Sequence, residues 1–207
     1  MNMCITEEKL VDRYGQGNPH ERFMLIYKNY EVFLNLVESY EAGLFNRILY
    51  EREYNLRAKN GEEVGVRIQT NRISDPTARQ AIENILIREV IEEEKDSGNI
   101  LKDTDDPEKH RRDIITLHMM RREYAVFDKS LKALSGRDYR ITYRYINKEQ
   151  KLEKIAEEED LAYQSIKNLI AVTRKTLEQR TIPFFGLSIK MMFSEQKNRK
   201  NRGKSFD

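Results

Sequence analysis

The stretch LEKIAEEEDLAYQSIKNLIAVTRKTL, residues 152–177, decides how this chain folds and what it could bind. Its apolar residues recur at helical spacing on either side of a polar run, which predicts a short helix, a turn and a second helix. The predicted buried face consists of Leu152, Ile155 and Ala156, then Leu161 in the turn, then Ile166, Leu169, Ile170, Val172, Thr173 and Leu177. Spacing alone fits an ordinary helical hairpin as well as a steep crossing of two helices.

In the second interpretation, a helix-turn-helix, the start of the second helix lies in the major groove of DNA. The side chains expected to face the groove are Tyr163, Gln164, Ser165, Lys167 and Asn168. Gln, Asn and Lys can make directional contacts with base edges, and Ser can bind a base or a phosphate. The residues expected at phosphates are Arg174 and Lys175 on the second helix and Lys151 and Lys154 on the first. Such phosphate contacts supply affinity and salt dependence rather than sequence choice.

Residues 152–177 resemble, without a gap, the C-terminal promoter-reading region of bacterial sigma factors, and LSGRDYRITYRYIN at 134–147 resembles the helix before it. Two residues depart from the family pattern. Glu159 occupies a position that is usually apolar, and Asp160 replaces the usual turn glycine. Asp tolerates the left-handed backbone conformation better than most residues, so the turn can still form.

The start SDPTARQAIENI, a long helix and the sigma-like segment are together similar to the ArpU and RinA type of late-gene activators from phages of Gram-positive bacteria. That likeness covers roughly residues 74–180. Residues 20–130 contain no region like the aromatic-rich basic helix with which a full sigma factor melts a promoter. The likeness implies a sequence-specific regulator of phage or prophage transcription, with double-stranded DNA as a partner. The helical N-terminal part could contact RNA polymerase.

Outside this segment the composition favours an all-α fold, because 9 Gly and 4 Pro in 207 residues suit long helices. A heptad stripe predicts one helix beginning near Pro19 and ending at Asn60-Gly61. The stripe consists of Phe23, Ile26, Tyr30, Phe33, Val37, Tyr40, Leu44 and Ile48. Two interpretations remain open: packing on the protein's own core, or a coiled-coil-like contact of residues 23–48 with a second copy.

The whole sequence predicts four consecutive segments. Residues 1–73 form a helical region with a loop, or a short strand, at Val64–Ile68. Residues 74–134 form an antiparallel helical hairpin whose helices begin at the prolines of Ser74-Asp75-Pro76 and Asp105-Asp106-Pro107. Residues 135–193 form the sigma-like domain, and 194–207 a disordered basic tail. The first hairpin helix is expected to end at Gly98. Its side chains expected to be buried are Ala78, Ile82, Ile85, Ile87, Val90 and Ile91.

Enzymatic activity, a metal site and a cofactor are not expected. Cys4 is the only cysteine, and the three histidines are not spaced as a metal-binding pair. No apolar run has the roughly 20 residues that span a bilayer, and the first residues lack the order of a signal peptide, so we expect a cytoplasmic protein. Residues 137–207 hold 16 Lys or Arg against 10 Asp or Glu, an excess that points modestly to a polyanionic partner.

Two other functions fit parts of the sequence. A phage DNA-packaging protein of the small terminase type would also join a helix-turn-helix to an oligomerising helical region. A helical adaptor would keep the same fold and bind only protein. The segment PFFGLSIKMMF, 183–193, is expected to fold back and bury Phe184, Phe185, Met192 and Phe193, and would mark a partner surface if it stayed exposed.

Overall fold

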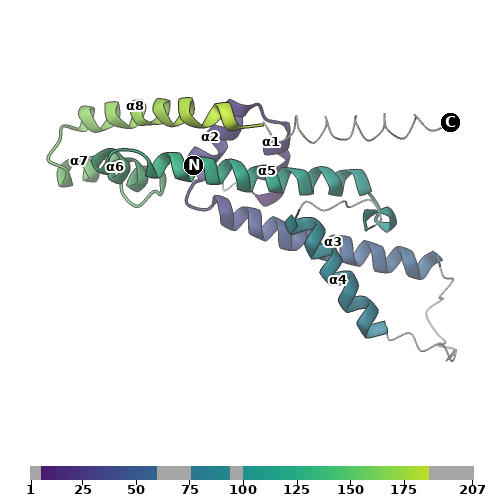
Figure 1. Cartoon of the computed structure of the whole chain (residues 1–207). Helices are drawn as coiled ribbons and strands as arrows, with labels where there is room; N and C mark the ends of the chain where they lie inside the picture. The colour runs from purple at the N-terminus through teal and green to yellow at the C-terminus, as the bar shows by residue number, and fades with distance from the viewer. Residues whose placement is uncertain (1–5, 60–75, 94–99, 187–207) are drawn as a thin grey trace, which may run out of the picture. The chain divides into compact units, whose positions relative to one another are not determined.

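The computed structural model describes residues 6–59, 76–93 and 100–186, and every regular element within these ranges is a helix (Figure 1). The prediction of an all-α fold is confirmed. The α-helices are α1 (Glu7–Gln16), α2 (Pro19–Asn29), α3 (Phe33–Lys59), α4 (Pro76–Glu93), α5 (Pro107–Lys132), α6 (Gly136–Ile146), α7 (Leu152–Glu158) and α8 (Tyr163–Thr181). Two short 3-10 helices, η1 (Leu101–Asp103) and η2 (Ile182–Phe184), complete the described elements. The predictions for Val64–Ile68, Gly98 and the tail 194–207 lie outside the described residues.

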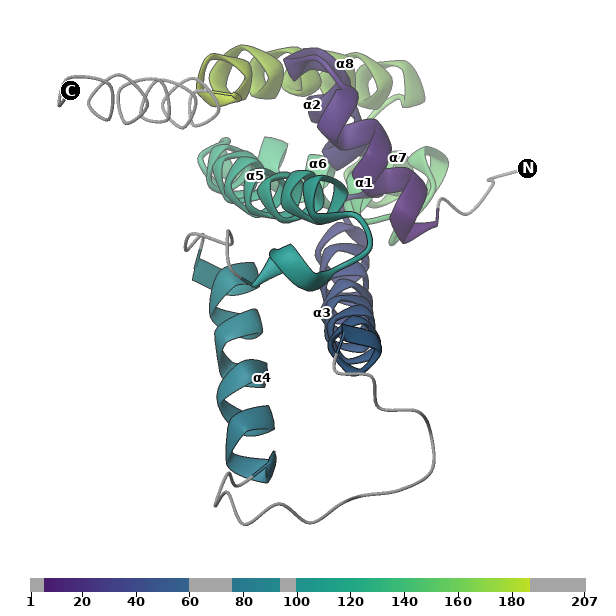
Figure 2. The same ribbon diagram turned by 90° about the vertical axis from the view of Figure 1, so that its right-hand side faces the viewer.

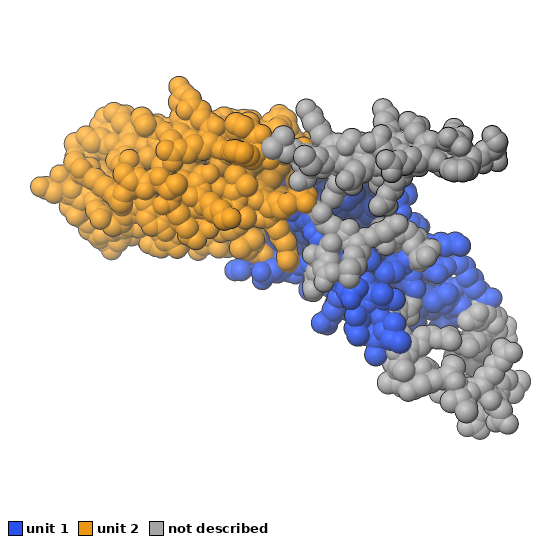
Figure 3. Space-filling view, in the orientation of Figure 1, with its two compact units in different colours: residues 1–15, 35–118 blue, residues 16–34, 119–207 orange. Residues whose placement is uncertain are grey.

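The chain divides into two compact units, which Figure 3 colours separately. Unit 1 contains residues 1–15 and 35–118, and unit 2 contains residues 16–34 and 119–207. Each unit therefore combines stretches that are distant in the sequence. The four consecutive segments named above remain a prediction about domains.

The heptad stripe runs along two helices, so the prediction of one continuous helix from Pro19 is wrong. Helix α2 ends at Asn29 and α3 begins at Phe33. The Asn29 side chain donates to the carbonyl of Leu25, and the Val32 N–H bonds to the Asn29 carbonyl in a tight turn. All eight stripe residues are buried within the single chain. Of the two interpretations of the stripe, packing on the protein's own core is therefore the one that the structure shows. The stripe is not exposed for contact with a second copy.

Several helices begin where local chemistry predicts. Helix α4 begins at Pro76 and α5 at Pro107. Asp106 precedes α5, and its carboxylate accepts the Lys109 N–H at 2.9 Å, which satisfies a free donor of the first turn. Ser135 caps α6 in the same manner by accepting from the N–H of Asp138.

In unit 1, polar contacts join α3 to the first part of α5. Tyr40 donates a hydrogen bond to the Asp113 carboxylate at 2.7 Å, and His110 lies 2.7 Å from the Glu51 carboxylate. Burial raises the pKa of the Asp113 carboxyl, although the Tyr40 hydrogen bond opposes that rise.

Helix α4 packs on α3, where the Arg88 guanidinium lies 5.3 Å from the centre of the Phe45 ring. Ile87, Val90 and Ile91 are buried, whereas Ile82 and Ile85 are 59% and 57% exposed, so the prediction that these two are buried is wrong. They lie on a different face of α4 from the buried residues. The ribbon views draw α4 obliquely to α5 (Figures 1 and 2), and the antiparallel hairpin of residues 74–134 remains a prediction.

In unit 2, aromatic side chains pack α2 against the second part of α5. Phe23 lies against Phe127, and Tyr30 stacks on Tyr124 with ring centres 5.4 Å apart. At the end of the described chain Phe185 is buried and Phe184 is 59% exposed. The expectation that this segment folds back therefore holds for Phe185 and is wrong for Phe184, while the residues from 187 onward lie outside the described part.

Among the described residues, no helix is both long enough and apolar enough to cross a bilayer.

Candidate nucleic-acid interface

Helices α6, α7 and α8 share a small apolar core. Ile141 of α6, Ile155 and Ala156 of α7, and Ile166 and Ile170 of α8 are buried together. Four partly buried side chains pack around this cluster: Tyr145, Leu152, Leu161 and Leu169. Seven of the ten residues predicted for the buried face of the two helices thus meet in one place. Leu161 lies where the sequence places it, between α7 and α8.

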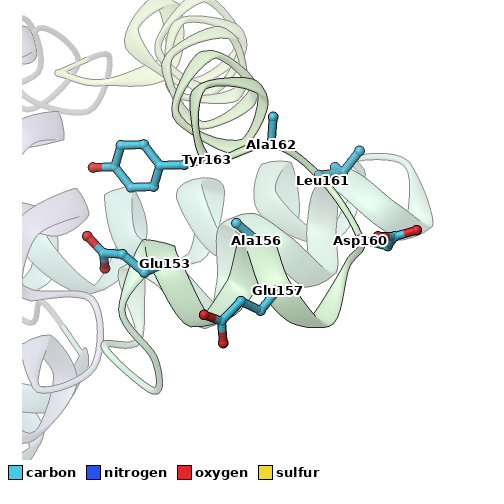
Figure 4. A pocket seen from close by; sticks show the side chains of 7 residues that line it. All are labelled: Glu153, Ala156, Glu157, Asp160, Leu161, Ala162 and Tyr163. Carbon is cyan, nitrogen blue, oxygen red and sulfur yellow. The ribbon is translucent and has the colours of Figure 1, made fainter.

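The turn between α7 and α8 is a Schellman motif, in which the last carbonyls of a helix accept from the two N–H groups that follow it. The Leu161 N–H bonds to the Ala156 carbonyl at 3.0 Å, and the Asp160 N–H to the Glu157 carbonyl at 3.3 Å. Asp160 has a φ of 50°, in the left-handed region. This turn reverses the chain in few residues, and Figure 4 looks almost along α8 while α7 runs across the view, so their axes cross steeply.

The second half of α8 is fixed by other parts of unit 2. The hydroxyl of Thr142 on α6 donates to the buried Thr173 hydroxyl at 3.0 Å. His20 of α2 lies 2.6 Å from the Glu178 carboxylate. Leu177 is fully buried, but Val172 is 64% exposed, so its predicted place on the apolar face is wrong. The buried residues of α8 lie on one stripe, and Val172 lies on the opposite side of the helix.

All nine residues predicted to contact DNA are exposed. On α8 these are Tyr163, Gln164, Ser165, Lys167, Asn168, Arg174 and Lys175. Lys151 is the residue directly before α7, and Lys154 lies on α7 with its ammonium 4.0 Å from the Glu158 carboxylate. Residues 163–175 include three basic side chains and no carboxylate. The structure therefore brings the α8 residues together on one solvent-facing surface.

Two of these side chains are joined by a hydrogen bond. The amide nitrogen of Gln164 donates to the amide oxygen of Asn168 at 2.9 Å. The two residues are four apart on α8, a separation at which helical side chains are neighbours. Both remain exposed, so the pair presents its other donors and acceptors to solvent.

Glu159, which departs from the sigma pattern, is held by arginines of α6. Arg140 contacts its carboxylate through two nitrogens, at 2.9 and 2.6 Å, and Arg144 lies 3.5 Å away. The Arg140 hydrogen bond lowers the pKa of the Glu159 carboxyl. Arg144 also binds Glu158 and lowers the pKa of that carboxyl. The acidic end of α7 is thus attached to α6 by ion pairs.

An open groove lies between α7 and the start of α8 (Figure 4). Its sides carry the carboxylates of Glu153, Glu157 and Asp160 and the ring of Tyr163. Ala162, the residue before α8, supplies no side-chain cap to the N–H groups of the first turn. Because carboxylates repel phosphates, a DNA backbone would approach α8 away from this groove.

Three features of the site were not predicted from the sequence. The acids Glu153 and Glu157 of α7 and Asp160 of the turn line the groove beside the start of α8. Glu159 pairs with Arg140, for which the arginines of RDYRITYR are a signal in the sequence. Helix α2 contacts α8 through His20, and this contact depends on tertiary packing.

Comparison of the chain with protein-family models, with curated proteins and with solved structures finds no match.

Proposed function

We propose that this protein binds double-stranded DNA in a sequence-specific manner and regulates transcription, with α7 and α8 acting as a helix-turn-helix. The observation that carries the proposal is the outward surface of α8. It is exposed, rich in amide and basic side chains and free of carboxylates from 163 to 175, while its opposite face is buried against α6 and α7. A helix held in this way can enter the major groove without unfolding its own support.

The charges around α8 support one orientation on DNA. Lys167, Arg174 and Lys175 lie along the helix, and Lys151 and Lys154 lie at the start of α7. A duplex that contacts these five cations gains counterion release, whereas the acidic groove beside Tyr163 disfavours a phosphate there. The likeness to sigma factors adds the expectation of a promoter and of RNA polymerase as a partner.

The alternative function, a DNA-packaging protein, was supported by the heptad stripe as a possible oligomerising surface. Those eight side chains are buried within one chain, which removes that support.

The test measures binding to a randomised duplex library and then to single duplexes at several salt concentrations. Wild-type protein should enrich a defined motif. Arg174→Ala with Lys175→Ala should weaken binding to all duplexes alike and reduce the salt slope by about 2, about one for each lost phosphate contact. Lys28→Ala with Lys129→Ala is the matched control, because it removes two exposed lysines of unit 2 that lie outside the proposed surface. Equal binding to all sequences by the wild-type protein would contradict the proposal.

A further inference from the structure

The amide pair on α8, Gln164 and Asn168, can recognise a particular base as well as contact DNA in general. The Asn168 amide oxygen already accepts one hydrogen bond, from Gln164 at 2.9 Å. In this pair the Asn168 oxygen is the bonded atom, and the Asn168 nitrogen takes no part in the contact. A second lone pair on the oxygen and both hydrogens on the nitrogen remain for a ligand.

We propose that Asn168, positioned by Gln164, recognises an adenine base in the major groove. This inference rests on the proposed function and specifies what α8 recognises. Adenine presents an acceptor, N7, beside a donor, the N6 amino group, and an asparagine amide matches both at once. The Asn168 nitrogen donates to N7, and its oxygen accepts from N6.

The fixed orientation of the amide also disfavours the other purine. Guanine presents two acceptors, N7 and O6, at the corresponding edge. The Asn168 oxygen would then face O6, and two acceptors without a hydrogen between them repel. An amide free to rotate could reduce this conflict, but rotation breaks the bond from Gln164. Gln164 therefore acts as a positioning residue that increases discrimination between adenine and guanine.

The surroundings of the pair agree with base contact rather than phosphate contact. Both amides are neutral, and they lie on α8 near Lys167, with Arg174 and Lys175 further along the helix. Cations supply attraction to the backbone in any sequence, whereas a neutral amide has no net charge to draw it to a phosphate and can make two hydrogen bonds to a matching base edge.

The test starts from the motif that the full-length wild-type protein enriches from the randomised library. Replacing each adenine of that motif in turn by 7-deazaadenine removes only the N7 acceptor. At one position this change should weaken wild-type binding about tenfold and leave binding by Asn168→Ala unchanged. Asn168→Asp keeps an acceptor but loses the donor, so its preference at that position should move to cytosine, whose amino group donates.

Gln164→Ala separates positioning from folding. It should reduce the preference for adenine over guanine several-fold at the same position and leave preferences elsewhere in the motif intact. A purely structural role would instead lower affinity for all sequences alike. Gln179→Ala, an exposed amide further along α8, is the control and should leave the whole motif unchanged.

The outcomes separate this inference from the proposed function. If the wild-type protein enriches no motif, the proposed function fails and adenine recognition fails with it. If a motif is enriched but Asn168→Ala keeps the same preference at every position, the protein is a sequence-specific DNA binder and the inference about Asn168 is overturned.

Discussion

Two residues with side chains adopt the left-handed backbone conformation on either side of α7. Lys148 has a φ of 52° and Asp160 a φ of 50°. Each follows a helix that ends in a Schellman motif: the Glu149 N–H bonds to the Arg144 carbonyl after α6, as the Leu161 N–H does to that of Ala156 after α7. Glycine is the usual residue at such positions because it has no Cβ to clash. The short helix α7 is therefore flanked by two positions where side chains cost stability.

Asp160→Gly should raise the free energy of unfolding. The substitution removes the steric cost of the left-handed conformation, and we expect a gain of about 0.5–1 kcal/mol after the greater chain entropy of glycine is subtracted. Urea denaturation followed by circular dichroism measures the change. Glu157→Gly is the matched control: it places glycine inside α7 and should destabilise by about 1 kcal/mol. A loss of stability in Asp160→Gly would show that the Asp160 side chain contributes more than its backbone costs.

Glu159 shows how an acidic residue can replace an apolar one in a helix-terminal position. Its side chain is mostly buried, and Arg140 and Arg144 supply the partners that burial requires. Because the folded protein lowers the pKa of this carboxyl, the ionised form stabilises the fold above the ordinary pKa. That contribution is lost as the pH falls through the lowered pKa.

Glu159→Gln should therefore change the pH dependence of stability. The wild-type protein should exceed the variant in unfolding free energy at neutral pH, and the difference should shrink steadily as the pH is lowered from about 5 toward 3. Denaturation curves across this range provide the measurement. Glu157→Gln, which neutralises an exposed neighbouring carboxylate, should show no such trend. A difference that stays constant with pH would mean that the Arg140 contact does not depend on the charge of Glu159.

At the scale of single elements, helix starts were predictable because they depend on local chemistry. Pro76, Pro107 and Ser135 stand at or beside helix starts in the structure as in the sequence. The positions where helices break, and the faces that they bury, were less predictable. The end of α2 at Asn29 depends on side-chain bonds inside a continuous apolar stripe, and Ile82 shows that apolar residues on two faces of a helix are not all buried.

The start of α8 is weakly capped, and this leads to a prediction. Ala162 has the extended conformation of a capping residue, with φ −61° and ψ 138°, but no side chain to accept a hydrogen bond. Ala162→Ser should place a hydroxyl within reach of the Gln164 N–H in the first turn and raise the free energy of unfolding by about 1 kcal/mol. Thermal or urea denaturation tests this. Ala171→Ser, the same change at an exposed position within α8, should be neutral or slightly destabilising. Equal effects of the two substitutions would rule out capping as the cause.

At the scale of the whole molecule, the candidate site depends on segments that no local pattern connects. Residues 152–177 contain the apolar core of α7 and α8, and the sequence predicted it well. The support beneath it includes α2 and the second part of α5, which meet through Arg22 and Glu123, 101 positions apart in the sequence. Arg22 of α2 donates to Glu123 of α5 at 2.9 Å, and the other carboxylate oxygen of Glu123 accepts the Gly186 N–H at 2.8 Å. No spacing rule joins these three positions, so a contact of this kind could not be predicted from one sequence.

Breaking this buried pair should destabilise unit 2 strongly. Both side chains are almost fully buried, so Glu123→Gln removes a carboxylate that neutralises a buried guanidinium, at a cost of about 3–5 kcal/mol. Arg22→Met removes the guanidinium beside the buried Glu123 carboxylate and should cost a similar amount. Arg22→Met combined with Glu123→Met should cost less than the sum of the two single changes, because each single change loses the same interaction between the two charges. The control is Lys132→Ala, which breaks an ion pair of similar length with Asp128 whose lysine is exposed, and should change stability little. Strictly additive effects of the single and double variants would show that the two charges do not stabilise each other.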